Sequence, residues 1–235
     1  MAADVSDSRR WTRDGTTLFL AAADLDEAAL GAPSALPGWT RRHLLAHVAA
    51  NARALGNLVH WAATGEPTPM YSSPEDRAAG IEGGAALPAD ELNAWLHRSA
   101  RALDDAMTAL SDEQWQAPVV TAQGRTVPAT EVPWLRAREV YVHGVDLATG
   151  LSFTEMPADF RTALCDEVVA KRGNAPGSAL VLEAVDTGGR WELPGRDEAV
   201  ALSGSLAEIT AYLTGRPHEL TTAGGDPAPT LGPWL

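Results

Sequence analysis

Apolar residues recur with a helical period in four long segments of the first two thirds of the chain. Each segment ends near glycine or proline, and Thr40 is placed to cap the start of the second one. Four amphipathic helices of this length predict a bundle. A stretch rich in Pro, Gly and Ser between the second and third helices predicts a long connection at 66–87. The predicted helices are 8–30, 40–65, 92–110 and 130–149.

The pattern changes after Gly150, where short alternating segments predict strands. A helix over about 157–172 precedes them, and Ser205 with Glu208 forms a capping-box pattern that opens a last helix, which ends at Gly215. The predicted strands are 180–183, 190–193 and 199–202. The sequence therefore predicts an α+β protein, with a four-helix bundle over 1–150 and a smaller α+β domain over 151–235.

The chain has 235 residues, of which 45% are hydrophobic, so it can bury a substantial core. Its formal net charge of −13 disfavours nucleic acid and anionic lipid, since both are bound mainly through clustered Lys and Arg. We therefore expect neither as a partner. An anionic small substrate is compatible with this charge only if arginines are concentrated in its pocket.

No secretory leader and no run of about 20 apolar residues is visible, so we expect a soluble, cytoplasmic protein. The single cysteine, Cys165, excludes an internal disulfide framework and any site built from several cysteines. Because no histidine is near it in sequence, Cys165 is predicted to be a small core residue. A reaction that depends on a thiol would have to borrow that thiol.

One position in the fourth helix breaks the apolar pattern. Leu135, Glu139, Val142 and Asp146 follow the spacing of a bundle seam, and an unpaired acid in a seam is expensive to bury. His143 lies one turn after Glu139, so both side chains share a face and can reach one ion.

The second helix carries His47 at the edge of its apolar stripe, where a facing helix could bring it to Glu139 and His143. Two imidazoles and a carboxylate suit zinc and leave a coordination position for chemistry. An ordinary structural role is the alternative, with Glu139 paired to Arg136 or Arg138. The spacing alone leaves both interpretations open.

Three longer stretches carry a family resemblance: GWTRRHLLAHVAANA, HWAATGEPTPMY and TAQGRTVPATEVPWLRAREVYVHGVDL. With SGSLAEITAYLTGR near the end, they resemble mycothiol-dependent maleylpyruvate isomerases of the DinB-like metalloprotein superfamily. The resemblance implies a zinc-binding four-helix bundle with His47, Glu139 and His143 as the ligands. It also implies a C-terminal domain that closes the site and contributes an arginine, for which Arg216 is the matching residue.

The implied activity is the mycothiol-dependent conversion of 3-maleylpyruvate to 3-fumarylpyruvate in gentisate-type aromatic catabolism. Zinc and mycothiol would be the cofactors, and Arg216 would hold a substrate carboxylate. Arg125, Arg136 and Arg138 are secondary candidates for contacts with the anion. Two alternatives remain open, a mycothiol S-transferase and a noncatalytic protein that binds a metal or small ligand, and the oligomeric state is unknown.

Overall fold

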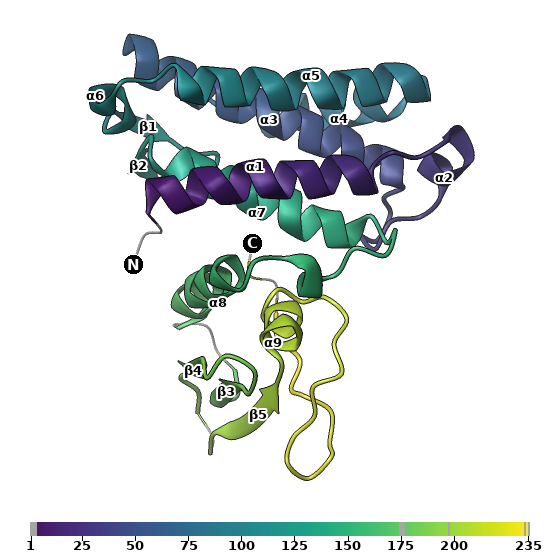
Figure 1. The fold of residues 1–235 in the computed structure, drawn as a ribbon, viewed down its shortest axis with the longest axis vertical. Coiled ribbons are helices and arrows are strands. Elements are labelled where there is room, and N and C mark those ends of the chain that lie inside the picture. Colours follow the sequence, from purple (N-terminus) through teal and green to yellow (C-terminus); the bar gives the residue numbers. More distant parts are fainter. Residues whose placement is uncertain (1–3, 174–176, 197, 233, 235) are drawn as a thin grey trace. The chain divides into compact units, whose positions relative to one another are not determined.

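Four long helices build the first unit of the chain, within its described residues 4–151 (Figure 1). The computed structural model describes residues 4–173, 177–196, 198–232 and 234, and the chain divides into units Met1–Leu151 and Ser152–Leu235. Helix α1 packs along α7, α5 packs along α3, and α3 also contacts α7. The long helices are α1 (Val5–Ala22), α3 (Arg41–Thr64), α5 (Ala89–Thr108) and α7 (Glu131–Asp146).

Local sequence signals set the ends of α3. Thr40 caps its start in a capping box with His43, which takes the place usually held by Glu or Gln. Gly65 ends it with φ of 76°, a left-handed conformation that glycine adopts without steric penalty. Pro133 is the third residue of α7, in the first turn, where a missing backbone N–H costs no intrahelical hydrogen bond.

Helices α1 and α7 approach each other closely at Gly15. A Cβ atom at this position would lie 2.8 Å from Cγ2 of Val140 and 2.9 Å from the ring of Tyr141. Thr12, on the same face of α1, donates a hydrogen bond to the Pro133 carbonyl oxygen at 2.6 Å. These contacts hold α7, the helix that carries Glu139, in the bundle.

The predicted connection over 66–87 is wrong in part, because helix α4 (Pro74–Ala85) lies within it. Ser73 caps this helix by accepting a hydrogen bond from the Asp76 backbone N–H, and Pro74 occupies its first turn. Three glycines give α4 the composition of a loop. One of them, Gly84, has a packing role, since a Cβ there would lie 2.4 Å from the Trp95 ring.

Two further segments differ from the prediction. The first helix ends at Ala22, and a separate short helix, α2 (Glu27–Gly31), starts after the cap at Asp26. The predicted loop before α7 contains a short helix and a two-stranded antiparallel hairpin. These elements are α6 (Asp112–Trp115), β1 (Pro118–Val120) and β2 (Thr126–Pro128).

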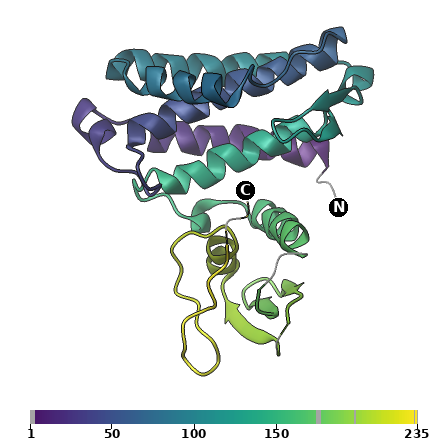
Figure 2. The same cartoon turned by 180° about the vertical axis from the view of Figure 1, so that it is seen from behind.

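The second unit is a small α+β structure with a three-stranded sheet (Figure 2). Strand β3 lies in the middle, antiparallel to β4 and parallel to β5. Helix α8 packs against β4, and α9 packs against α8 and β3. The elements are η1 (Phe153–Glu155), α8 (Ala158–Arg172), β3 (Leu180–Ala184), β4 (Arg190–Leu193), β5 (Val200–Gly204) and α9 (Leu206–Leu213).

A search of the described helices for one that is both long and apolar enough to cross a membrane finds none.

Candidate metal centre

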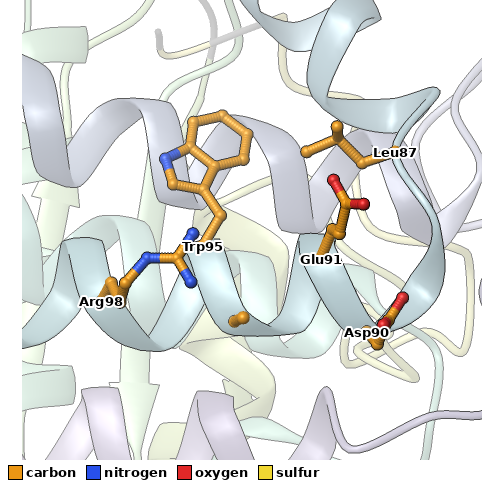
Figure 3. Close-up of a pocket in the computed structure, with 6 residues that line it drawn as sticks. Leu87, Asp90, Glu91, Trp95 and Arg98 are labelled. Atoms are coloured by element: carbon orange, nitrogen blue, oxygen red, sulfur yellow. The ribbon is translucent and has the colours of Figure 1, made fainter.

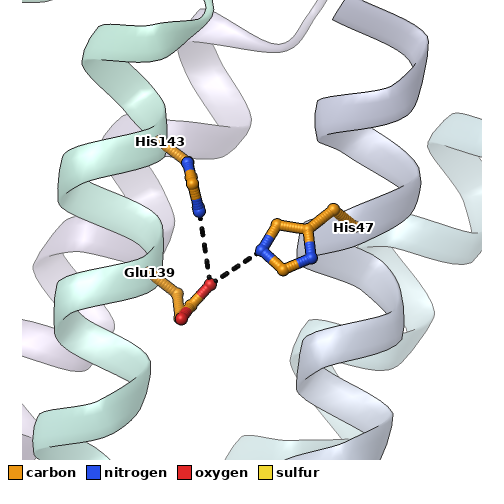
Figure 4. A group of neighbouring side chains, drawn as sticks. All are labelled: His47, Glu139 and His143. Atoms are coloured by element: carbon orange, nitrogen blue, oxygen red, sulfur yellow. Dashed lines mark hydrogen bonds and ion pairs between the residues drawn. The ribbon is translucent and has the colours of Figure 1, made fainter. Parts of the chain in front are cut away.

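Helices α3 and α7 bring the three predicted ligands together (Figure 4). Nε2 of His47 lies 2.9 Å from Oε2 of Glu139, and Nε2 of His143 lies 3.4 Å from the same oxygen. One potential ligand atom from each residue lies within 4.8 Å of the other two. The group therefore presents two imidazole nitrogens and a carboxylate oxygen to one point, the usual donor set of an open zinc site.

The three side chains differ in their access to solvent. The His47 side chain is buried, whereas Glu139 and His143 retain exposed fractions of 21% and 17%. Two of the three possible ligands are therefore only partly buried. This arrangement suits a catalytic site better than a sealed structural one.

His143 is held from behind by Asp146. Oδ2 of Asp146 lies 2.9 Å from Nδ1 of His143, and the Asp146 side chain is only 1% exposed. A carboxylate that accepts the Nδ1 proton fixes the ring and leaves Nε2 free to bind a metal. The sequence analysis noted Asp146 as a seam residue without giving it a role. Its spacing of three residues from His143 places both side chains on one helix face and could have indicated this contact.

His47 has a different neighbour at its outer nitrogen. Nη2 of Arg77, on α4, lies 3.4 Å from Nδ1 of His47, and the Trp39 ring packs against the imidazole with centroids 5.5 Å apart. The sequence analysis missed Arg77 because it treated this segment as a connection. The cap formed by Ser73 and Pro74 was the signal that could have revealed α4.

The contacts shift the pKa values of the group in opposite directions. Burial would lower the pKa of His143, but hydrogen bonds to Asp146 and Glu139 outweigh it and raise this pKa from 6.5 to about 9. Burial lowers the pKa of His47, and the hydrogen bond to Glu139 only partly offsets the effect. Burial alone would raise the pKa of Glu139, yet the two histidines hold it well below 4.5. Glu139 is therefore a carboxylate at neutral pH.

Both histidines pair with the carboxylate of Glu139. Arg136 is buried one turn away, where Nη1 donates to the Val48 carbonyl oxygen at 2.8 Å and to Oδ1 of Asn51 at 2.9 Å. Arg136 thus joins α7 to α3. Arg138, the other proposed partner, is also buried.

Arg216 lies in the second unit, directly after α9 and Gly215. Its Nη1 donates to the Thr214 carbonyl oxygen at 2.5 Å. The group of His47, Glu139 and His143 is formed by the first unit alone. The role implied for Arg216 therefore stays a prediction.

Cys165 lies in α8 and is fully buried, as predicted for a core residue. Burial raises the pKa of its thiol to about 12, while a contact of 3.4 Å with the Thr210 hydroxyl opposes the rise. A thiol with this pKa is almost wholly protonated at neutral pH and is a poor nucleophile.

Comparison with known proteins agrees with this architecture. The family model for the N-terminal domain of mycothiol maleylpyruvate isomerase matches residues 11–148. The crystal structure of a mycothiol-dependent maleylpyruvate isomerase has a TM-score of 0.91 and 39% identity, with 97% of each chain covered. A mutant of such an isomerase, with one histidine replaced by alanine, gives a TM-score of 0.91 and 38% identity over the same share of both chains. No curated protein sequence matches the chain.

A more distant solved structure supports the fold alone. YfiT from Bacillus subtilis, a probable metal-dependent hydrolase with an unusual four-helix bundle topology, has a TM-score of 0.51 and 16% identity. The match covers 61% of this chain and 83% of YfiT. The predicted α+β class, with an N-terminal DinB-like bundle and a C-terminal α+β region, is confirmed. The chain therefore belongs to the family of mycothiol-dependent maleylpyruvate isomerases, which confirms the resemblance in its sequence and the prediction that it is an enzyme.

Proposed function

We propose that the chain is a zinc- and mycothiol-dependent isomerase that converts 3-maleylpyruvate to 3-fumarylpyruvate. The observation that carries the proposal is the meeting of His47, Glu139 and His143 at one point in a chain of this family. The net charge of −13 supports a small molecule rather than nucleic acid as substrate. The expected cytoplasmic location is part of the proposal.

The three residues fit zinc in donor type and in their surroundings. Glu139 is ionised, and Asp146 accepts from Nδ1 of His143, so Nε2 of that ring can act as a ligand. Three protein ligands leave a position for a further group. Zinc held there would stabilise the thiolate of mycothiol at neutral pH.

Isomerisation requires the carbon–carbon double bond of the substrate to become single for a time. Bound mycothiol would supply a thiolate that adds reversibly across this bond, with the π electrons taken up by the conjugated carbonyl, so that rotation becomes possible and the thiol is released unchanged when the carbon–sulfur bond breaks.

Arg216 is proposed to hold a substrate carboxylate. A guanidinium can pair with both oxygens of a carboxylate in one plane, which fixes orientation as well as position. Arg136 is less suited to this role because it is buried and already donates to Val48 and Asn51.

The test is turnover of maleylpyruvate by zinc-loaded protein with and without mycothiol. We expect fumarylpyruvate to form only with mycothiol, while the concentration of free thiol stays constant. Loss of one thiol for each substrate molecule would instead identify an S-transferase, which stops at the adduct. Absence of fumarylpyruvate in the presence of both cofactors would refute the proposed reaction.

A further inference from the structure

A cavity of about 470 Å³ lies in the first unit, and its lining includes Arg77, the neighbour of His47. It is lined from α3, from α4, from the segment before α4, and by one aromatic side chain of α5. Its main polar and aromatic lining residues are Arg53, Asn57, Tyr71, Asp76, Arg77 and Trp95. A volume of this order suits a ligand of drug size, and a small diacid would fill only part of it.

The chemistry of the wall is mixed. Arg53 and Arg77 supply positive charge, Asp76 supplies negative charge, and Asn57 and Tyr71 add uncharged polar groups. The Asn57 amide also donates to the Pro69 carbonyl oxygen at 3.0 Å, so it anchors the segment that closes one side. Charged and uncharged polar groups beside an indole suit a polyhydroxylated ligand, because its hydroxyls can bond to the polar groups and its C–H face can pack on the ring.

The wall of the cavity contacts the metal centre through Arg77. Its guanidinium lines the cavity, lies 3.4 Å from Nδ1 of His47, and sits over the Tyr71 ring at 5.8 Å. Burial raises the pKa of Tyr71, Arg77 opposes the rise, and the charge of Glu139 adds to it. Arg77 therefore links the cavity wall to His47, and Tyr71 lies beside Arg77 in that wall.

When His47 binds a metal, its Nδ1 and the Arg77 guanidinium beside it need an additional hydrogen-bond acceptor. When Nε2 of His47 binds a metal, Nδ1 carries the ring proton, and a guanidinium has no lone pair to accept it. An oxygen of a ligand beside Arg77 and His47 could accept from both.

We propose that this cavity binds the sugar-like, polyhydroxylated part of the thiol cosubstrate and directs its sulfur past Arg77 toward the His47, Glu139 and His143 group. The inference rests on the proposed function, because it takes mycothiol, a cysteine derivative of an amino sugar joined to inositol, as the thiol. It assigns mycothiol recognition to α3, α4 and α5 of the first unit.

Trp95 also lines a smaller cavity of about 280 Å³ (Figure 3). Asp90, Glu91 and Arg98 of α5 line it, and Figure 3 shows Trp95 between Arg98 and Glu91. This second cavity shares the indole and has the same kinds of charged group, without Arg77. It therefore provides a control for effects that come from α5 itself.

Two glycines of α4 allow a matched test. A Cβ at Gly80 or at Gly83 would meet nothing within 4 Å, and both residues are exposed helical positions. Gly80 lines the cavity, whereas Gly83 does not belong to its lining. Gly80→Leu should therefore fill the cavity without a clash in the fold, and Gly83→Leu makes the same change outside it. Arg98→Ala controls for the second cavity.

The first measurement is calorimetric binding of S-methylmycothiol, whose blocked sulfur makes it a weak metal ligand, to the metal-free proteins. We expect Gly80→Leu to raise its Kd about tenfold or more, because the ligand loses its space. Gly83→Leu and Arg98→Ala should bind like the wild type. Equal affinities of Gly80→Leu and Gly83→Leu, or no binding by the wild type, would overturn the inference.

The second measurement is turnover by the zinc-loaded proteins. Gly80→Leu should raise KM for mycothiol and leave KM for maleylpyruvate unchanged, and the rate with N-acetylcysteine, which lacks the sugar part, should match the wild type. A rise confined to KM for maleylpyruvate would place the acid in the cavity and overturn the inference. If the protein has no isomerase activity but Gly80→Leu still weakens S-methylmycothiol binding, the cavity assignment stands and only the proposed reaction is refuted.

Discussion

Replacement of Asp146 by asparagine tests how the chain prepares His143 to bind metal. The change keeps the size of the side chain but removes the charge that faces Nδ1 at 2.9 Å. Because Asp146 is 1% exposed, water cannot easily take over this role. The asparagine oxygen can still accept the Nδ1 proton, though without the added strength of a carboxylate.

The expected effect on zinc affinity follows from this contact. A hydrogen bond to a charged group contributes about 1.5–3 kcal/mol, which corresponds to roughly ten- to a hundredfold in an equilibrium constant. Loss of outer partners of metal-binding histidines has effects of about this size. We therefore expect Asp146→Asn to bind zinc about ten- to a hundredfold more weakly.

Competition with a chelator of known affinity measures this change, and circular dichroism verifies that the variant is folded. Asp104→Asn, at an exposed position of α5, is the matched control and should bind zinc like the wild type. A nuclear magnetic resonance titration of the metal-free variant provides a second readout, since the pKa of His143 should fall from about 9 toward 6.5. Wild-type zinc affinity together with an unchanged His143 pKa would refute the orienting role of Asp146.

Four further predictions concern the metal ligands, the pH dependence of zinc binding, Cys165 and Arg216. His47→Ala and His143→Ala should lose zinc and activity together while remaining folded, and full zinc content in both, by elemental analysis, would disprove the ligand assignment. Without metal the pKa of His143 is raised to about 9, so zinc must displace a proton from this ring at pH 7. The affinity for zinc should therefore rise about tenfold per pH unit up to that pKa. A chelator titration from pH 6 to 9 that shows no such slope would contradict this prediction. Cys165→Ser should keep most of its activity, and thiol-free turnover that is lost in this variant would make Cys165 the nucleophile. Arg216→Ala should reduce kcat/KM about ten- to a hundredfold with zinc retained, Arg216→Lys should recover only part of the loss, and unchanged kinetics in Arg216→Ala would pass the substrate-anchoring role to another arginine.

The sequence predicted the long helices of the bundle because their burial pattern is local. Leu44, Leu45 and Val48 of α3 recur with the helical period and are all fully buried. Helix α4 escaped because Gly80, Gly83 and Gly84 lower its helix propensity, and composition then favoured a loop. Its stability comes from packing on α3, and a single sequence does not show that contact.

The same division between local and nonlocal information applies to the metal centre. Glu139 and His143 are one turn apart, so their shared face follows from helix geometry, and Asp146 is equally readable from a spacing of three. Their meeting with His47 required the bundle prediction as well. Arg77 is different, because its contact with His47 depends on a helix that the sequence did not reveal.

The difference between the ligand triad and the residues around it bears on which reaction the proposed metal centre catalyses. The sequence leaves both an isomerase and a mycothiol S-transferase open for the same ligand triad, so the triad cannot itself select isomerisation over transfer. The choice depends on which electrophile is held beside the thiol, and for how long the adduct stays bound before the sulfur leaves. Groups beyond the triad must control those two properties. In the first unit, Arg77 and Tyr71 both line the cavity. Arg77 contacts His47, and Tyr71 interacts electrostatically with Glu139. We therefore expect changes on α4 and in the segment before it to alter the reaction more readily than conservative changes within the triad, which would remove the metal and with it every thiol-dependent activity.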